Sequence, residues 1–537
     1  MKNTITLLGA ALLLTGCALR TADVAEHDPL DDFGPMLAAA SEQGNIELLC
    51  GDTDWPELPP QTPPVTNGDL WERLRSGFAM DLQRDDPRIT AERNWLIRNP
   101  QYIERVTTRA QRYLYHIVEQ AEQKQVPLEL ALLPIVESAF DPFAYSHGRA
   151  SGPWQFIPST GLAFGLKQNY WYDGRRDILA STDAALEYLS RLALRFNGDW
   201  ELALASYNAG GGTVSKAIRR NTQRNRPTDY WSLDLPRETR AYVPKLIAIS
   251  QIILEPERYG LTLQPIANTP YFAVVDTGGQ LDLQLAAELS GVDVNEIYYL
   301  NAGYSRWSTP PSGPHRLLMP VANAEALQTA LVDLPAEKRL RWQQYTIANG
   351  DTLGGIAKRF NTTVDALRAT NNIPGNTIVA GRMLLIPQPS ADPQAYRLSA
   401  DNRLQAKQSQ APGNSSRIDY SVRNGDSLWS IARKHNVSVQ QLAKWNGMAP
   451  GDTLSVGRKL VIWSQSGNTA SVPSGGDRPE MIRRVNYSVR RGDSLHRIAN
   501  RFNVSVNQIA SWNNLNTNRY LRPGQHLKLF VDVRHAP

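Results

Sequence analysis

The segment PIVESAFDPFAYSHGRASGPWQFIPSTG, residues Pro134–Gly161, is the most informative stretch of this 537-residue chain. It places one carboxylate, Glu137, between an apolar run and a Gly- and Ser-rich turn that leads to the amide of Gln155. The apolar run would partly remove Glu137 from water, and desolvation raises a carboxyl pKa toward the range of a general acid at neutral pH. A lone glutamate beside apolar residues usually sits on the wet face of a helix, so this segment alone leaves both interpretations open.

Three further motifs follow that segment along the chain. They are DGRRD at Asp173–Asp177, FNGDWELALASYNAG at Phe196–Gly210 and ETRAYV at Glu238–Val243. In this order, the four segments resemble the catalytic domain of the lysozyme-like lytic transglycosylases. The resemblance covers about residues 90–257 and implies a mainly α-helical, lysozyme-like domain. Apolar residues that recur every three or four positions through 182–196 independently predict a helix.

The resemblance assigns roles to individual positions. Glu137 matches the family's catalytic glutamate, which acts alone as general acid and general base. Eight positions match residues that contact the sugar or hold the glutamate: Ser138, Ser146, Gln155, Ile157, Tyr207, Asn208, Glu238 and Tyr242. Buried structural hydrogen bonding is the competing interpretation for these helpers. The family often has Leu-Met before the glutamine, whereas Pro153-Trp154 stands here, so Trp154 is a candidate for altering the sugar subsite.

The reaction implied by the resemblance needs only one carboxylate. Most glycosidases use two, and Asp141 lies four residues after Glu137, but an Asp-Pro pair is typical of a helix end. In the family, the glutamate protonates the oxygen between N-acetylmuramic acid and N-acetylglucosamine. It then takes the proton of the muramic C6 hydroxyl, which closes on C1 to give a 1,6-anhydro end. A hydrolytic muramidase and a non-catalytic wall-binding protein are the alternatives, and the complete motif set argues against the latter.

Other candidate sites have simpler interpretations. We expect Asp173–Asp177 to form a structural ion-pair network, and Asp199 to cap the helix that follows it. The aromatic run Tyr170–Tyr172 either stacks on sugars or packs in the core. The eight histidines show no metal-ligand spacing, so we expect neither a metal nor a cofactor.

The N-terminus predicts export and a lipid anchor. A basic residue precedes an apolar stretch, Ile5–Leu14, that is too short to span a bilayer and is followed by Thr15-Gly16-Cys17. This pattern is typical of an export signal, and the Cys after Gly resembles a bacterial lipoprotein signal; the alternative is an ordinary signal peptide with a chance Cys. Lipidation of Cys17 would hold the protein at a membrane. Because Ala18 rather than Asp follows, the resemblance favours the outer membrane, on its periplasmic face.

Composition is consistent with an exported chain of several domains. The 57 Lys and Arg only slightly exceed the 52 Asp and Glu, and no basic stripe argues for a nucleic-acid partner. With Cys17 lipidated, Cys50 has no intramolecular partner, which excludes a disulfide framework. The expected partners are peptidoglycan glycan strands and a membrane, and we expect a monomer.

The C-terminal third contains three copies of one pattern. Each copy starts at a Gly-Asp-Thr/Ser-Leu sequence, carries Ile-Ala at a fixed offset and closes with a Gly and an apolar run. The pattern predicts strand, helix, helix, strand, with the Asp as N-cap of the first helix. These small α+β units resemble LysM domains, which implies binding to N-acetylglucosamine-containing glycans. The resemblance implies that the glycan-binding loops contain Gly350, Asp351, Thr352, Gly425, Asp426, Ser427, Gly492, Asp493 and Ser494.

The predicted fold class is therefore a mainly α lysozyme-like catalytic domain followed by βααβ LysM modules. The predicted boundaries are 1–16 for the signal peptide, 17–68 for a tether and N-terminal extension, 69–257 for the catalytic domain (core about 115–250) and 258–340 for a spacer. The three LysM modules are predicted at 343–388, 418–463 and 485–530, and the linkers between them at 389–417 and 464–484. Tyr271–Pro320, within the spacer, echoes the repeat pattern without its Gly-Asp pair, which fits a degenerate LysM-like unit. The linkers are rich in polar residues, and we expect them to be flexible.

Overall fold

The computed structural model describes residues 68–360, 362–413, 415–465, 482–490, 493–495, 498–499, 506–513, 515, 521–522 and 524–532. The chain divides into two compact units, Met1–Gly413 with Arg417–Ser464, and Asn414–Ser416 with Gln465–Pro537. The predicted signal peptide, Cys17, most of the tether and of the second linker, and Gly492 lie outside the described residues.

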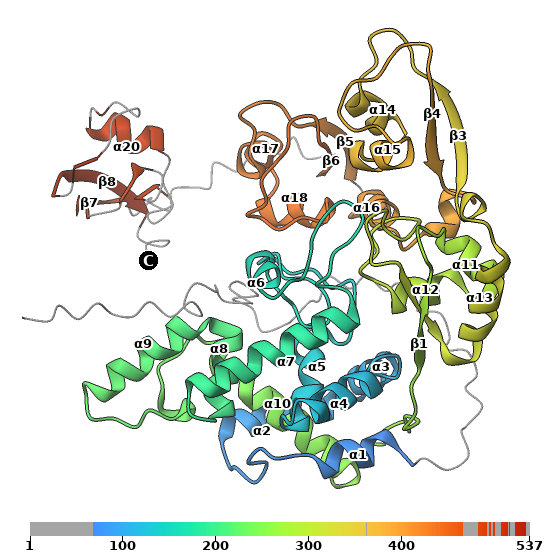
Figure 1. Ribbon diagram of the computed structural model, residues 1–537. Coiled ribbons are helices and arrows are strands. Elements are labelled where there is room, and N and C mark those ends of the chain that lie inside the picture. The colour runs from blue at the N-terminus through green and yellow to red at the C-terminus, as the bar shows by residue number, and fades with distance from the viewer. Residues whose placement is uncertain are drawn as a thin grey trace, which may run out of the picture. The chain divides into compact units, whose positions relative to one another are not determined.

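The first part of the chain is helical (Figure 1). Its elements are α1 (Leu70–Ser76), α2 (Pro87–Arg98), α3 (Pro100–Ala110), α4 (Leu114–Gln123), η2 (Leu128–Leu132), α5 (Leu133–Ser138), α6 (Pro158–Ala163), α7 (Ile178–Arg195), α8 (Trp200–Ala209), α9 (Gly211–Thr222), η3 (Tyr230–Ser232), α10 (Thr239–Leu254) and η4 (Pro256–Tyr259). As predicted, Asp199 caps α8, by accepting a hydrogen bond from the amide of Leu202. Helix α10 is the central element, because it is buried on nearly all sides, as expected of a helix that is apolar around its circumference.

The spacer folds in the same order as the repeats. Its elements are β1 (Phe272–Asp276), α11 (Leu283–Ser290), α12 (Val294–Leu300), β2 (Arg316–Pro320) and α13 (Val321–Asp333), and β1 pairs antiparallel with β2. The side chain of Asn301 ties α12 to β2: it donates to the carbonyls of Ile297 (2.9 Å) and Leu318 (2.8 Å) and accepts from the amide of Leu318 (2.8 Å).

The three repeats use an asparagine in the same way. The short helix η5 (Ala336–Lys338) precedes repeat 1, which contains β3 (Arg341–Thr346), α14 (Leu353–Arg359), α15 (Val364–Thr370) and β4 (Met383–Gln388). Repeat 2 contains β5 (Ser415–Ser421), α17 (Leu428–Lys434), α18 (Val439–Trp445) and β6 (Lys459–Gln465). Repeat 3 contains β7 (Ile482–Ser488), α20 (Val506–Asn513) and β8 (His526–Asp532). Asn371, Asn446 and Asn513 each bond a helix carbonyl and both backbone groups of one strand residue. This shared pattern of hydrogen bonds makes 271–320 a fourth, divergent copy of the unit.

The first helix of a repeat is not capped by the predicted aspartate. The N-caps are the next residues, Thr352 and Ser427, whose hydroxyls accept from the amides of Gly355 and Ser430. Asp351 instead accepts from the hydroxyl of Tyr345 (2.6 Å) and an upstream amide (2.9 Å). The prediction was wrong because the tyrosine in the preceding strand offers the aspartate a closer donor than the helix does.

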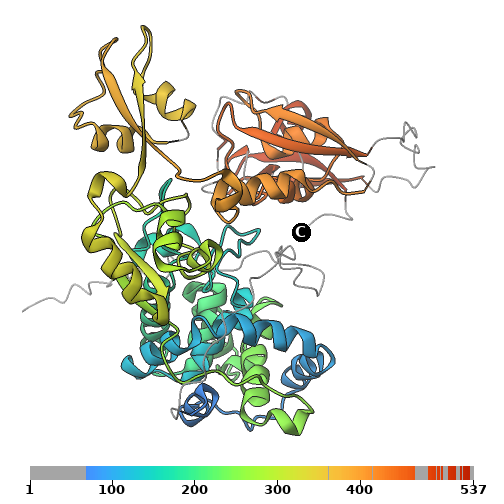
Figure 2. The ribbon, with the colours of Figure 1, turned by 90° about the vertical axis from the view of Figure 1, so that its right-hand side faces the viewer.

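The spacer packs firmly against the helical domain, with the yellow-green strands beside the blue and teal helices in both views (Figures 1 and 2). Arg112 and Glu296 form an ion pair at 2.7 Å and are 1% and 3% exposed. The hydroxyl of Tyr271 also donates to Glu296, at 2.8 Å. A buried ion pair requires such additional partners, since both charges have left water. Arg316 pairs with Asp177 at 2.8 Å.

The first linker is ordered over much of its length, contrary to the prediction of flexibility for 389–417. It contains η6 (Pro393–Tyr396) and α16 (Ala400–Ser409). Tyr396 is 2% exposed and donates to Asp282 at 2.9 Å, and Leu398 joins the same apolar core of the spacer. The polar composition was misleading because two apolar anchors, together with partners far upstream in the sequence, are enough to order this segment.

Candidate active site

Glu137 lies in the last turn of α5 and is only 5% exposed. The helix ends at Ser138 because Ala139 and Phe140 adopt positive φ angles of 51° and 56°. Asp141 therefore lies beyond the helix, where it accepts a hydrogen bond from the amide of Phe143 at 2.8 Å. The helix thus ends before Asp141, as the Asp-Pro pair predicted.

The two oxygens of Glu137 have different surroundings. Oε1 accepts a hydrogen bond from the hydroxyl of Tyr242 on α10. Oε2 is buried and has no hydrogen-bond partner among the described residues. Buried polar atoms are normally satisfied, so this unpartnered carboxyl oxygen requires an explanation, and a catalytic role is one. One oxygen is held in place while the other is available to a ligand.

The proton affinity of Glu137 is set by burial. Desolvation raises the pKa of Glu137 from 4.5 to about 8; the hydrogen bond from Tyr242 lowers it, Glu238 raises it and Lys245 lowers it. Burial also raises the pKa of the Glu238 carboxyl, against the charge of Lys245 and a hydrogen bond from Asn208. At neutral pH, Glu137 is therefore mainly protonated and can act as an acid.

Tyr207 and Asn208 reach the same region from α8. Both are buried: the hydroxyl of Tyr207 donates to the carbonyl of Trp154 at 2.9 Å, and Asn208 accepts from the hydroxyl of Thr239 at 2.8 Å. Tyr207 is close enough to Glu137 for the carboxylate to raise its pKa, after the larger effect of burial. The fold thus brings Glu137, Tyr207, Asn208, Glu238 and Tyr242 together from three helices.

The remaining predicted helpers make structural hydrogen bonds. The Ser138 hydroxyl lies 2.9 Å from the carbonyl of Pro153 and ties α5 to the following turn. Gln155, at a φ of 50°, donates to the carbonyl of Gly152 at 2.8 Å. Ser146 accepts from the amide of Ala150 at 3.0 Å. Ile157, which has no polar side-chain group, is half-buried and directly precedes α6. Contact of these four residues with substrate stays a prediction.

The turn between α5 and α6 is held close to the rest of the domain. A Cβ on Gly152, which has a φ of 82°, would lie 1.9 Å from the carbonyl oxygen of Arg175, so only glycine fits. Trp154 is fully buried, and its indole N–H donates to Thr182 at 3.0 Å. Its ring fills the core, and an effect of Trp154 on the sugar subsite stays a prediction.

The acidic and aromatic motifs after the turn are structural. Asp173 pairs with Arg175 at 2.8 Å, and Asp177 caps α7 and pairs with Arg316, which confirms the predicted ion-pair network. Of the aromatic run, Tyr172 is buried and bonds Asp177 at 2.8 Å, while the Arg306 guanidinium lies 3.6 Å from the ring centre of Tyr170. These rings pack between the helical domain and the spacer, which decides the earlier alternative in favour of packing.

The sequence did not reveal one charged neighbour of Glu137, the ammonium group of Lys245. Lys245, half-buried on α10, lowers the pKa of both Glu137 and Glu238. It also acts on Glu92 of α2, whose pKa is raised by burial. The spacing of Glu238, Tyr242 and Lys245 could have revealed Lys245, because residues four and three apart share a helix face.

The predicted glycan-binding loops of the repeats have one geometry. Gly350 and Gly425 both have a φ of 85°, which requires glycine in practice. The aspartates that follow accept from a strand tyrosine, as Asp426 does from Tyr420 at 2.8 Å and Asp493 from Tyr487 at 2.5 Å. Each loop is therefore fixed by its own module, with Thr352, Ser427 and Ser494 next in sequence.

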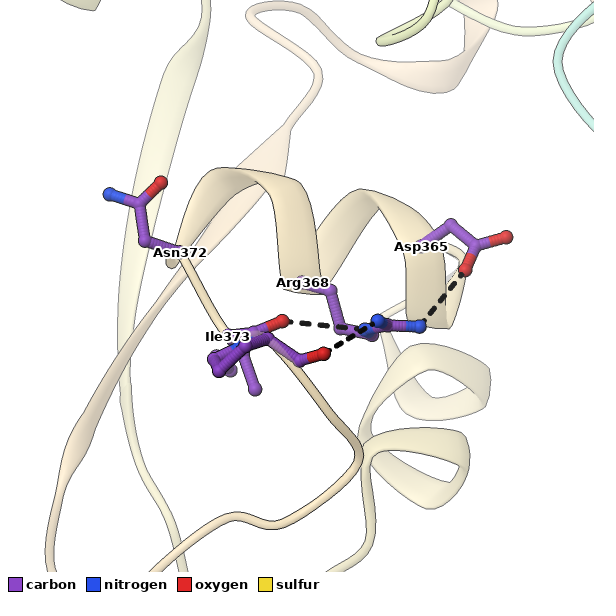
Figure 3. A pocket seen from close by; sticks show the side chains of 5 residues that line it. Asp365, Arg368, Asn372 and Ile373 are labelled. Carbon is purple, nitrogen blue, oxygen red and sulfur yellow. Dashed lines mark hydrogen bonds and ion pairs between the residues drawn. The ribbon is translucent and has the colours of Figure 1, made fainter.

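Repeat 1 also carries a pocket (Figure 3). It is lined by Asp365, Arg368, Asn372, Ile373 and Pro374, on α15 and the turn after it. The Arg368 side chain is already engaged there: it lies 3.8 Å from Asp365 and donates to the carbonyl of Pro374 at 3.1 Å.

Within the described ranges, no group of three or more His, Cys, Asp and Glu side chains could hold a metal ion.

Comparison with known protein families divides the chain in the same way. The family described as Transglycosylase SLT domain matches residues 115–229. The LysM domain matches residues 345–387, 420–463 and 487–530. A third family, described as the LysM-like domain of lytic transglycosylase MltD, matches residues 271–336, the region of the fourth copy. The predicted fold class, a helical catalytic domain followed by LysM modules, is confirmed.

Individual proteins match over different lengths. The membrane-bound lytic murein transglycosylase D of Escherichia coli (strain K12) is 37% identical over 464 residues, which are 84% of this chain and 97% of that protein. The protein of the same name from Escherichia coli O6:H1 matches to the same extent. An autolysin of Enterococcus faecalis is 32% identical over 173 residues, 32% of this chain and 22% of its own length.

Proposed function

Since this chain belongs to the family of membrane-bound lytic murein transglycosylase D, we propose that it cleaves the β-1,4 bond between N-acetylmuramic acid and N-acetylglucosamine and leaves a 1,6-anhydromuramic end. The enzyme class, a lytic transglycosylase and thus a lyase, follows from the family. Glu137 supplies the acid and base of the reaction. In the cell, the enzyme serves turnover and remodelling of the wall.

Glu137 performs both proton transfers in this proposal. With a pKa of about 8 it enters the reaction protonated, and Oε2, which has no protein partner, gives the proton to the glycosidic oxygen as the bond to C1 breaks. The carboxylate then takes the proton of the C6 hydroxyl while that oxygen bonds to C1. Glu137 ends as it began, and no water is consumed. A positioned acid or base typically accelerates a reaction by about 10² to 10⁴.

The single observation that carries this proposal is the buried Glu137 with one oxygen held by Tyr242 and one unpartnered. A hydrolytic muramidase is the second candidate, because Glu238 is a neighbouring carboxylate. A hydrolase needs that second group as a nucleophile or as an ionised base toward water. The family of the chain, whose matched relatives are lytic transglycosylases, favours the one-carboxylate reaction.

Attachment to the wall and to a membrane completes the proposal. The LysM modules bind the glycan strands of peptidoglycan through the loops at Asp351, Asp426 and Asp493. Cys17 carries the lipid that anchors a monomeric enzyme to the periplasmic face of the outer membrane, after export by a lipoprotein signal peptide. No helix among the described residues is long and apolar enough to cross a membrane.

Digestion of purified sacculi, with the products weighed by mass spectrometry, tests the proposal. Anhydro-muropeptides, lighter by one water than hydrolytic products, are the expected result. Products with reducing muramic ends would instead identify a hydrolase, and a repeat with Glu238→Gln would then show whether Glu238 is its second carboxylate. Absence of any product from the full-length lipidated protein would overturn the enzymatic proposal.

A further inference from the structure

One face of α10 carries three polar residues toward the candidate acid. Glu238 directly precedes the helix, Tyr242 follows four residues later and Lys245 three residues after that. Residues at these intervals lie on the same side of a helix. Since Tyr242 bonds Glu137, this side of α10 faces Glu137, and Lys245 lies one turn further along it.

Lys245 is half-buried among carboxylates that it does not touch. Helix α2 packs along α10 (Figure 1), and the charge of Lys245 also acts on Glu92 of α2. Glu137 and Glu238 complete the set of neighbouring acids. Within the part of the chain that the structure describes, Lys245 forms no ion pair. The positive charge of Lys245 therefore acts on three carboxyl groups at a distance and forms an ion pair with none of them.

The reaction proposed above places a particular demand on this site. Glu137 must lose its proton and regain one in the same turnover, so both of its charge states have to be accessible. Burial and the nearby Glu238 both disfavour the ionised form. A cation at a distance can offset them without fixing the carboxylate in an ion pair that would occupy the oxygen needed for catalysis.

We propose that Lys245 is a positioning residue that stabilises the ionised form of Glu137 between the two proton transfers. This inference rests on the proposed function. The segment that matches the transglycosylase family ends at residue 229, so Glu92 and Lys245 both lie outside it. They are supplied by α2 and by α10.

The charges that face Glu137 act with opposite signs. After burial, Tyr242 and Lys245 lower its pKa and Glu238 raises it, while Tyr207 on α8 is a neutral neighbour. Loss of Lys245 should therefore raise the pKa of Glu137, and loss of Glu238 should lower it. Activity requires the protonated acid, so kcat/KM falls as the pH rises through the pKa near 8, and this basic limb reports the shift.

The test compares pH profiles of kcat/KM for full-length variants acting on sacculi. Lys245→Met should move the basic limb upward, and Glu238→Gln should move it downward, each by about 0.5 to 1 pH unit, as expected for a nearby charge. The Lys245→Met variant should also lose roughly tenfold in kcat, because one pKa unit corresponds to about tenfold in the population of the ionised form. Lys245→Arg should restore both.

Arg240→Met is the matched control, because it removes a positive charge from an exposed position on α10 and should leave the basic limb in place. Thermal unfolding of each variant identifies a folding defect. A basic limb that stays in place in a folded Lys245→Met variant overturns the inference, whatever happens to kcat. That result differs from failure of the proposed function, in which the wild-type protein gives no anhydro product or Glu137→Gln remains active.

Discussion

The hydroxyl of Tyr242 donates a hydrogen bond to Oε1 of Glu137, which joins the central helix α10 to the short helix α5 across 105 residues of sequence. This contact leaves Oε2 as the free oxygen of the carboxyl. It also lowers the pKa of Glu137 against the larger effect of burial. One hydrogen bond therefore orients the acid and limits how far its proton affinity rises.

Replacing Glu137 by Gln should abolish turnover while wall binding remains. The amide is nearly isosteric but can neither give nor take the proton, so we expect kcat to fall by at least about 10² to 10⁴. Release of anhydro-muropeptides measures turnover, and co-sedimentation with sacculi measures binding. A variant that still cleaves at the wild-type rate would show that another residue is the acid.

Removing only the hydroxyl of Tyr242, as Tyr242→Phe, should raise the pKa of Glu137 above about 8, because a hydrogen bond that favours its ionised form is lost. The basic limb of the kcat/KM profile should therefore move to higher pH. Hydrogen bonds to charged groups contribute about 1.5–3 kcal/mol, which corresponds to a shift of about one to two pH units. Tyr230→Phe, which removes a buried hydroxyl that bonds Thr239, is a control for loss of a hydroxyl elsewhere. A downward shift in Tyr242→Phe would contradict the role assigned to the bond.

The sequence predicted the helical domain, the repeats and Glu137, because apolar spacing and repeated motifs are local signals. It did not predict which helper residues meet. The side chains of Ser138 and Gln155 donate hydrogen bonds to carbonyls of the adjacent turn, while Tyr242 bonds Glu137 from far along the chain. Partners at such separations are determined by packing, and only the family resemblance pointed to Tyr242.

Two errors of the sequence reasoning have the same physical origin. Asp351 was predicted as a helix cap, but the hydroxyl of Tyr345 competes for it. The segment after repeat 1 was predicted to be flexible, but Tyr396 finds Asp282 more than a hundred residues upstream. In each case a long side chain supplied a partner that local propensity does not include.

The spacer should be needed for stability of the helical domain. Glu296→Ala would leave the Arg112 guanidinium buried without its partner, and breaking a buried pair in this way typically costs about 3–5 kcal/mol. Glu255→Ala, which breaks the exposed pair with Arg258, should cost at most about 1 kcal/mol. Urea unfolding followed by circular dichroism measures both. Equal effects would show that the spacer does not contribute through this pair.

The ordered segment after repeat 1 should likewise stabilise the spacer. Tyr396→Ala removes a ring that is 2% exposed, together with its bond to Asp282, and truncation of a buried aromatic costs about 3–5 kcal/mol. The Gln405→Ala substitution, at an exposed position on α16, is the control and should be nearly neutral. If Tyr396→Ala unfolds at the wild-type urea concentration, the segment is not anchored as described.

Among the repeats, the second should bind glycan most strongly through Trp429. This indole is 56% exposed on α17, directly after Gly425-Asp426-Ser427-Leu428, and the Arg433 guanidinium lies 5.3 Å from its ring centre. Repeat 1 has Gly354 at the same offset from its aspartate. An exposed large aromatic beside a binding loop is typical of a contact residue, and its truncation commonly costs at least about 1 kcal/mol.

The measurement is co-sedimentation of the full-length Glu137→Gln protein with sacculi, in which cleavage cannot remove the binding sites. Adding Trp429→Ala should weaken the apparent affinity by about tenfold, since 1.4 kcal/mol is a factor of ten. Val456→Ala, also in repeat 2 and 70% exposed, is the matched control for loss of exposed apolar surface and should bind as before. Equal affinities for the Trp429 and Val456 variants would contradict a stacking role for the indole and would place the affinity of the modules in their backbone loops instead.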